Sequence, residues 1–190
     1  MIEFEKRGSL TKDQVIKLTS LMQEKGELLK NDSEKVVFFE TKEFPTVGNF
    51  NTGTARLSLK CDNKGNHFRI KEGNPSANVR SEYSVELKDT DIYNLIYILN
   101  RLGLTDGFYR PTDRKDYKFG NLMVTIKTNC VMGDHFELEL INPENNFEIE
   151  SKTLIEEIKL EFWTTEEYKT RIAHLMGSNP AINLIESKIF

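Results

Sequence analysis

The sequence predicts an α+β protein in which an antiparallel β-sheet or barrel carries helices on its outside. Three observations indicate this class. Eight or nine short segments alternate apolar with polar residues, which is typical of strands with one buried face. Residues 11–29 and 90–102 show helical apolar stripes that need an apolar surface to cover. These helices interrupt the strands at two places, and further helices follow at the end, an order that suits antiparallel pairing.

The first half of the chain begins with a strand at residues 1–7. Residues 11–29 form the first expected helix, with Thr11 and Gln14 spaced as a capping box. Its apolar stripe is expected to comprise Val15, Leu18, Met22 and either Leu28 or Leu29. The elements expected next are a short strand at 35–41, a loop at 44–53, strands at 54–61, 67–71 and 80–87, a hairpin turn at 62–66 and a turn region at 72–77.

The second half begins with the helix at 90–102, which Gly103 is expected to end. Residues 108–117 have a mixed pattern without a clear period. The elements expected after them are strands at 121–128 and 135–141, a loop at 142–146, helices at 152–160 and 165–176, and a short helix after Pro180.

The composition limits the classes of function. The 190 residues suit a single domain, with 38% hydrophobic and 29% charged residues. A net charge of −4 argues against an extended nucleic-acid surface. No apolar run approaches the roughly 20 residues that cross a bilayer, and the acidic N-terminus is unlike a secretory signal. We therefore expect an unprocessed cytoplasmic protein without a membrane partner, whose oligomeric state stays open, a homodimer being one alternative.

Cysteine and histidine residues give no metal signal. Cys61 and Cys130 lack the C-x-x-C spacing of a zinc site, although a single bridge stays open. His67, His135 and His174 fit no known metal-ligand spacing. We interpret each histidine as a surface or packing residue.

Charged residues recur on one face of strand after strand. In the first strand, Glu3, Glu5 and Arg7 share a face, which suits either a solvated edge strand or a metal and anion site. Later strands repeat such ladders at Arg56/Lys60, Arg69/Lys71, Glu82/Glu86 and Glu137/Glu139. If the helices cover the apolar faces, the charged faces line the interior of a barrel. Opposite charges would pair there, and a metal with a polyphosphate would complete the set.

These segments resemble the triphosphate tunnel metalloenzymes, a family that includes class IV adenylyl cyclases, thiamine triphosphatases and inorganic triphosphatases. Glu3-x-Glu5-x-Arg7 resembles the opening signature of the family. Residues 54–60 and 68–73 resemble its basic strands, 80–86 its Arg-x-Glu strand and 133–137 a late strand, in the same order. The resemblance covers about residues 1–177 and implies a closed eight-stranded β-barrel, or tunnel, with a charged interior.

The resemblance also implies roles for residues at matching positions. Acidic residues of the family hold one or two Mg²⁺ or Mn²⁺ ions, and its basic residues bind a triphosphate. The metal ligands carried over are Glu3, Glu5 and Glu137, with Glu82 and Glu139 as further candidates. Glu3, Glu5 and Arg7 are the expected catalytic residues. The expected substrate-binding residues are Arg56, Lys60, Arg69, Lys71, Arg80, Arg114 and Lys127.

Departures from the family pattern bear on the activity. Arg7 stands where the family usually has Lys, and Thr112 and Asp113 stand where the cyclase branch has a further basic residue. Lys127 stands where that branch has an acidic residue, which puts a second metal and cyclisation in doubt. We expect metal-dependent hydrolysis of a nucleoside or inorganic triphosphate. The alternatives are an adenylyl cyclase that makes cyclic AMP and pyrophosphate, and a non-catalytic module that binds nucleotide or polyphosphate.

Overall fold

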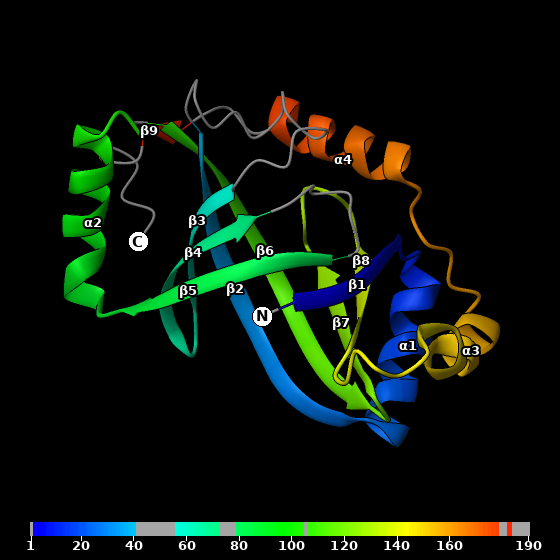
Figure 1. Cartoon of the computed structure of the whole chain (residues 1–190). Helices are drawn as coiled ribbons and strands as arrows, with labels where there is room; N and C mark the ends of the chain where they lie inside the picture. Colours follow the sequence, from blue (N-terminus) through cyan, green and yellow to red (C-terminus); the bar gives the residue numbers. More distant parts are fainter. Residues whose placement is uncertain (1, 41–55, 73–78, 105, 179–181, 184–190) are drawn as a thin grey trace.

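A computed structural model of the chain describes residues 2–40, 56–72, 79–104, 106–178 and 182–183 (Figure 1). Among these residues the helices are α1 (Lys12–Lys25), α2 (Asp89–Arg101), α3 (Phe147–Ile158) and α4 (Thr165–Ser178). The strands are β1 (Ile2–Ser9), β2 (Glu27–Glu40), β3 (Arg56–Asp62), β4 (Gly65–Glu72), β5 (Val79–Leu87), β6 (Asp106–Phe119), β7 (Leu122–Thr128), β8 (His135–Leu140) and β9 (Ile182–Asn183). The predicted α+β class is confirmed.

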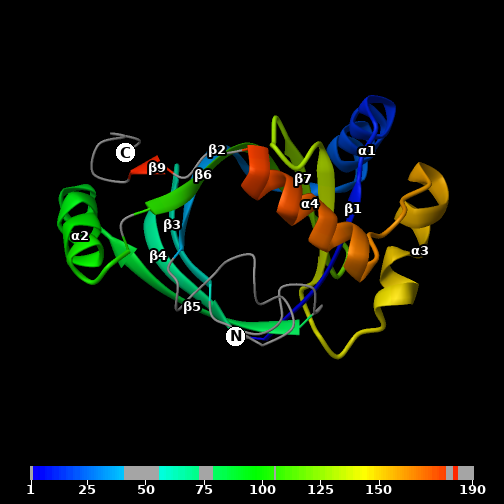
Figure 2. The same ribbon diagram turned by 90° about the horizontal axis from the view of Figure 1, so that it is seen from above.

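The strands form one antiparallel sheet in the order β2-β3-β4-β5-β1-β8-β7-β6-β9. In addition, β6 pairs with β2 along most of both strands, from Glu27 opposite Lys118 to Glu40 opposite Asp106. Each strand from β1 to β8 therefore has a hydrogen-bonded neighbour on both sides. Figure 2 shows these strands curving around a common centre.

The hydrophobic core lies outside this ring of strands, as the sequence predicted. On one side, α1 and α3 pack against the outer faces of β7 and β8 through residues such as Leu18, Leu154, Val124 and Leu138. On the opposite side, α2 packs against the outer faces of β2, β3 and β4 (Figure 1). Because the helices cover the apolar faces, the charged faces of the strands point into the ring.

The predicted helix at 11–29 is too long. The capping box of Thr11 and Gln14 is confirmed, but α1 ends at Lys25, and Gly26 adopts an extended backbone with φ −104° and ψ 164°. Residue 27 already belongs to β2, so Leu28 and Leu29 are exposed rather than part of the helical stripe. Pairing with β6 outweighs the continuing helical pattern here.

Two strands are longer than the sequence indicated. The expected strand at 35–41 is the end of the 14-residue β2, and the mixed segment at 108–117 lies within the equally long β6. Residues such as Asp32 and Pro111 are unfavourable in strands and hid the pattern. The 13 Cα pairs between β2 and β6 stabilise both strands over their full length.

The structure also tests the expected turn at 62–66 and the expected helix after Pro180. The turn at 62–66 is confirmed, with Gly65 at φ +122°. Residues 182–183 form β9 and pair with β6, so the short helix expected after Pro180 is wrong at these two residues. The loop at 44–53 lies outside the described residues, as do residues 73–77 of the expected turn region at 72–77. None of the described helices is long and apolar enough to cross a membrane.

The C-terminal helix α4 crosses one end of the ring (Figure 2). The segment before it is attached to β1, because the Trp163 backbone N–H donates to the Arg7 carbonyl at 2.8 Å. The Trp163 indole N–H donates to Ser9 Oγ, also at 2.8 Å. These bonds place the first turn of α4, including the buried Tyr168, over the interior.

Candidate active site

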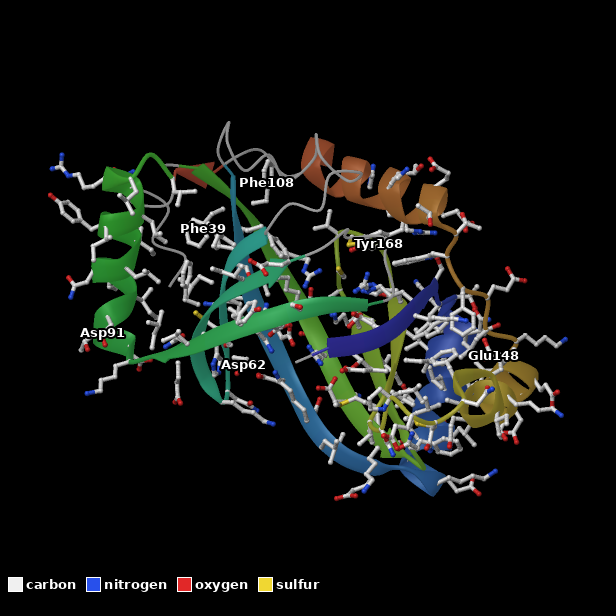
Figure 3. The ribbon with its side chains drawn as sticks, viewed as in Figure 1. Phe39, Asp62, Asp91, Phe108, Glu148 and Tyr168 are labelled. Atoms are coloured by element: carbon white, nitrogen blue, oxygen red, sulfur yellow. The ribbon has the colours of Figure 1, made fainter. Side chains whose placement is uncertain are left out.

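A cavity of about 260 Å³ lies inside the ring of strands. Among its described lining side chains, seven are cationic and five are carboxylates: Arg7, Lys60, Arg69, Lys71, Arg110, Arg114 and Lys127, with Glu5, Glu34, Glu82, Glu137 and Glu139. Figure 3 shows Tyr168 beneath α4 and Asp62 nearer the β3–β4 turn, so the charged interior extends away from α4. An excess of cations in a partly closed cavity favours an anionic ligand.

Arg7 of β1 lies between two carboxylates. Its Nε and Nη2 donate to the two oxygens of Glu5 at 2.8 and 2.6 Å, and Nε also donates to Glu137 Oε1 at 3.2 Å. Arg7 and Glu137 are Cα partners on β1 and β8, so the register of the sheet creates this contact. Burial lowers the pKa of Arg7, but Glu5, Tyr168 and Glu137 together raise it well above its ordinary value.

Lys127 of β7 supplies a second cation to Glu137. Its Nζ donates to Glu137 Oε2 at 2.6 Å, and the lysine is 4% exposed. Burial raises the pKa of Glu137, but Lys127 and Arg7 hold it well below its ordinary value. Burial lowers the pKa of Lys127, and Glu137 opposes that change. Glu137 is therefore an ionised carboxylate with a cation on each oxygen.

A second network of alternating charges joins β2, β3 and β6. Glu34 accepts from Arg114 Nη1 at 2.9 Å and lies 3.3 Å from Lys60 Nζ. Burial raises the pKa of Glu34, but Arg114, Lys127, Lys60 and Lys30 lower it to about 2. Further ion pairs of the network include Lys60–Asp62 at 2.8 Å, Lys30–Asp62 at 2.5 Å, Lys30–Glu34 at 3.5 Å and Arg114–Asp116 at 2.6 Å.

Sequence reasoning missed several members of this network. Glu34, Lys30, Asp62 and Asp116 all contribute buried charges. The alternation Lys30-x-Asp32-x-Glu34 was the available signal. Extending the strand expected at 35–41 back to residue 30 would have placed Lys30, Asp32 and Glu34 on one face of that strand.

Two arginine side chains have donors without an acceptor. Arg69 Nε and Arg110 Nε are buried, and within the part of the chain that the structure describes neither finds a hydrogen-bond partner. The Arg110 guanidinium lies 5.2 Å from the Phe38 ring centre, while Arg69 lies 3.7 Å from Glu82. A buried polar group without a partner costs free energy, so these two donors are suited to a ligand that accepts hydrogen bonds. Arg110 was not among the predicted site residues.

His135 also lines the cavity, although the sequence indicated only a surface or packing role. Its Nδ1 lies 2.8 Å from the Gly133 carbonyl oxygen, which can only accept, so Nδ1 donates. Its ring centre lies 5.4 Å from that of Trp163. Burial lowers the pKa of His135 to about 3, so the imidazole is neutral at physiological pH. His135 is thus a buried, packed residue, as one of the two interpretations expected, but its place in the cavity lining was not predicted.

The structure brings most of the predicted site residues together. Glu5, Arg7, Lys60, Arg69, Lys71, Glu82, Arg114, Lys127, Glu137 and Glu139 all line the cavity. The side chains of Glu3, Arg56 and Arg80 lie outside the described residues. Their backbone positions are given by the sheet, where Glu3 is opposite Arg80 and Arg56 is opposite Lys71.

The predicted metal ligands fit a cation unequally. Glu5 and Glu139 are Cα partners on β1 and β8, and both line the cavity with carboxylate groups of the kind that a hard divalent ion prefers. Both oxygens of Glu5 accept from Arg7, so an ion at Glu5 would displace that guanidinium, which also contacts Glu137. Glu137 is bound by Arg7 and Lys127, and Glu82 lies 2.5 Å from Lys71. Among the described residues, no group of three or more His, Cys, Asp or Glu side chains could hold a metal ion. The metal site stays a prediction.

No family model matches this chain, and neither does any curated protein. Solved structures do match. A protein of Pyrococcus horikoshii OT3 is 18% identical with a TM-score of 0.65, the match covering 87% of this chain and 95% of that one. A candidate adenylate cyclase from Vibrio parahaemolyticus is 14% identical with a TM-score of 0.59, covering 91% and 98%.

A third similar structure is a candidate adenylyl cyclase from Hippeastrum, described as having a dominant triphosphatase activity. It is 15% identical with a TM-score of 0.56, covering 85% of this chain and 89% of that one. At these identities the likeness is one of fold. The chain therefore has the fold of these candidate cyclases, and its resemblance to the triphosphate tunnel metalloenzymes is confirmed at that level.

Proposed function

We propose that this protein binds a triphosphate, nucleoside or inorganic, inside the ring of β1–β8 and hydrolyses it with Mg²⁺ or Mn²⁺. The observation that carries the proposal is the pair of buried donors, Arg69 Nε and Arg110 Nε, in a cavity whose described lining has seven cations and five carboxylates. A triphosphate supplies several anionic acceptors in a row. Arginine binds such oxygens with more than one N–H at a time.

The proposal includes a closed tunnel. Pairing of β6 with β2 supports closure, since it gives every strand from β1 to β8 two neighbours. In a closed tunnel the phosphates would be partly withdrawn from water, which strengthens their attraction to Lys60, Arg69 and Arg114. Existing ion pairs such as Arg114–Glu34 hold these cations in position before the ligand arrives.

Glu5 and Glu139 are the described residues that would hold the divalent ion. Glu3, two residues along β1, is a further ligand in the proposal. When bound, Mg²⁺ or Mn²⁺ would neutralise phosphate charge and lower the pKa of a water molecule. The basic side chains would orient the triphosphate for attack on its terminal phosphorus, and positioning of this kind supplies much of the rate enhancement in phosphoryl transfer.

Hydrolysis is proposed ahead of cyclisation. The described triphosphatase activity of the Hippeastrum protein supports a hydrolytic role for this fold. The cyclase branch has an acidic residue at the position of Lys127. In this chain the lysine instead binds Glu137, which supports a site with fewer metal ligands than a cyclase of that branch would have. Adenylyl cyclisation and binding without turnover are the other outcomes that an assay must separate.

The test incubates the protein with ATP or inorganic triphosphate, each with Mg²⁺ or Mn²⁺ and with a chelator, and separates the products. Release of orthophosphate only with metal is the expected result. Cyclic AMP with pyrophosphate would replace hydrolysis by cyclisation, and saturable binding without any product would leave a binding module.

A matched pair of variants locates the activity. Glu5→Gln removes a charge at the proposed metal site, and we expect turnover to be lost while the far-UV circular dichroism spectrum is unchanged. Glu156→Gln changes an exposed carboxylate on α3 and should leave turnover at the wild-type rate. Equal activity in both variants would remove Glu5 from the mechanism.

A further inference from the structure

We infer that the Lys127 ammonium is a built-in cation at Glu137, occupying the place that a second divalent ion would otherwise take. This inference rests on the proposed function, because it concerns how the same site divides its charge between metal and protein. The contact that carries it is Lys127 Nζ to Glu137 Oε2 at 2.6 Å, inside the ring of strands.

Both oxygens of Glu137 are already bound by cations of the chain. Arg7 Nε lies 3.2 Å from Oε1, and Lys127 Nζ takes Oε2. A carboxylate bound in this way cannot accept a divalent ion without displacing one of the two cations. Displacing Lys127 would leave a buried ammonium without its acceptor among the described residues, which is costly. At Glu5 a metal ion would displace Arg7 alone, and Arg7 would keep its contact with Glu137.

The register of the sheet separates this position from the proposed metal site. On β1 and β8, Glu5 is opposite Glu139, and the next inward-facing pair is Arg7 opposite Glu137. The Glu5/Glu139 pair thus contributes two carboxylates, whereas the Arg7/Glu137 pair joins a guanidinium to a carboxylate. Lys127 reaches Glu137 from β7, where its own Cα partner is His135.

Lys127 also has hydrogen-bonding capacity left for a ligand. An ammonium has three N–H donors, and among the described residues Glu137 is the one hydrogen-bond acceptor of Lys127. The lysine lines the cavity together with Arg110 and Arg114. Its remaining donors can therefore bind a phosphate oxygen while Glu137 holds it in place, bridging protein and substrate as a metal ion does.

The test counts Mn²⁺ ions by electron paramagnetic resonance and titration calorimetry, with Mn²⁺ alone as the probe. The wild-type chain is expected to bind one ion. Lys127→Met leaves one oxygen of Glu137 without a cation, and it should bind a second ion, with overall affinity raised at least about ten-fold by the lost charge repulsion. Lys127→Arg keeps the charge and should behave like the wild type.

Two controls separate a local effect from a general one. Lys118→Met removes an exposed charge on β6 and should not change Mn²⁺ binding. The double variant Lys127→Met/Glu137→Gln removes one charge of each sign and should return to one ion. If Lys127→Met were unstable, the comparison of the wild type with the double variant would still decide, because loss of the single ion in the double variant overturns the inference.

The inference fails if the wild-type chain binds two ions, or if Lys127→Met binds Mn²⁺ with wild-type number and affinity. Its failure is distinguishable from that of the proposed function. Absence of phosphate release with an extra ion in Lys127→Met would sink the hydrolysis and leave the inference standing. Metal-dependent release with no change in Lys127→Met would do the reverse.

Discussion

The Arg7 guanidinium lies 4.9 Å from the centre of the Tyr168 ring, and this contact joins the charged face of β1 to helix α4. Tyr168 also stacks on Trp163, with ring centres 6.0 Å apart and planes at 29°. The aromatic ring therefore shields one end of an ion-pair network from water. Coulomb interactions strengthen where water is excluded, so Tyr168 supports the Arg7–Glu5 and Arg7–Glu137 pairs.

Replacing Tyr168 should weaken this end of the site. Tyr168→Ala is expected to lower the free energy of unfolding by about 3 kcal/mol, because it removes a buried aromatic ring and its cation–π contact. Urea unfolding at neutral pH measures the change. Tyr168→Phe keeps the ring and should stay within about 1 kcal/mol of the wild type. Tyr83→Ala, at a ring that is 58% exposed, is the matched control; an equal loss there would contradict the argument.

The Lys127–Glu137 pair should show strong coupling in a double-mutant cycle. Glu137→Gln leaves a buried ammonium without its carboxylate, and we expect a loss of about 3 kcal/mol in the free energy of unfolding. Lys127→Met should cost less, since Arg7 still bonds Glu137. The double variant should recover part of the loss, and urea unfolding of all four proteins gives the coupling energy.

An exposed pair on α3 provides the comparison for this cycle. Lys152 and Glu156 are 3.9 Å apart with side chains 70% and 66% exposed. Exposed pairs of this kind contribute at most about 1 kcal/mol, so Glu156→Gln should have a small effect. Additive effects of Lys127→Met and Glu137→Gln would mean that the buried pair has no special stability.

Local pattern sufficed for the parts of the site in which charge alternates with apolar residues. On β1 and β8, Glu5, Arg7 and Glu137 were predicted to face the interior because Lys6 and Leu138 face the other way. The two-residue period of a strand and the need of the helices for an apolar surface together fix that orientation. Neither argument requires knowledge of which strands are neighbours.

The remaining part of the site depends on pairing between distant strands. Leu28 and Leu29 continue the helical stripe, so the start of β2 could not be placed locally, and Glu34 was lost with it. The sequence singled out Lys127 as unusual, but its contact with Glu137 follows from the register of β7 against β8. Arg110 faces the cavity through the pairing of β6 with β2, which lie more than 60 residues apart in the chain.

Acid should destabilise the protein before its carboxylates titrate. Burial lowers the pKa of His135 from 6.5 to about 3. A depressed folded-state pKa means that the unfolded chain binds the proton more readily, so this contribution to stability is complete above pH 6.5 and is lost as the pH falls towards 3. We expect the free energy of unfolding to fall by up to about 1.4 kcal/mol per pH unit below pH 6 from this group.

Urea unfolding at several pH values between 6.5 and 4.5 measures this slope. His135→Gln cannot titrate and should flatten it, whereas His174→Gln, at an exposed histidine on α4, should leave it unchanged. Below that window Glu34 adds its own loss, because its pKa is lowered from 4.5 to about 2 and its stabilising charge disappears as the pH falls through that range. A wild-type slope in His135→Gln between pH 6.5 and 4.5 would contradict the assignment.

Arg110 should contribute to ligand binding through a buried donor that has no hydrogen-bond partner among the described residues. Its buried Nε lacks an acceptor, and a charge-assisted hydrogen bond contributes about 1.5–3 kcal/mol. Arg110→Met is therefore expected to weaken the binding of inorganic triphosphate by about ten- to one-hundred-fold. Titration calorimetry measures this binding, and metal is left out so that the ligand is not hydrolysed. Arg101→Met, at an exposed arginine on α2, controls for the loss of one positive charge. Because Arg110 lies over the Phe38 ring, Arg110→Lys should recover only part of the affinity. Equal weakening in Arg101→Met would contradict a specific role for Arg110, because it would mean that the loss of one positive charge anywhere on the protein explains the effect.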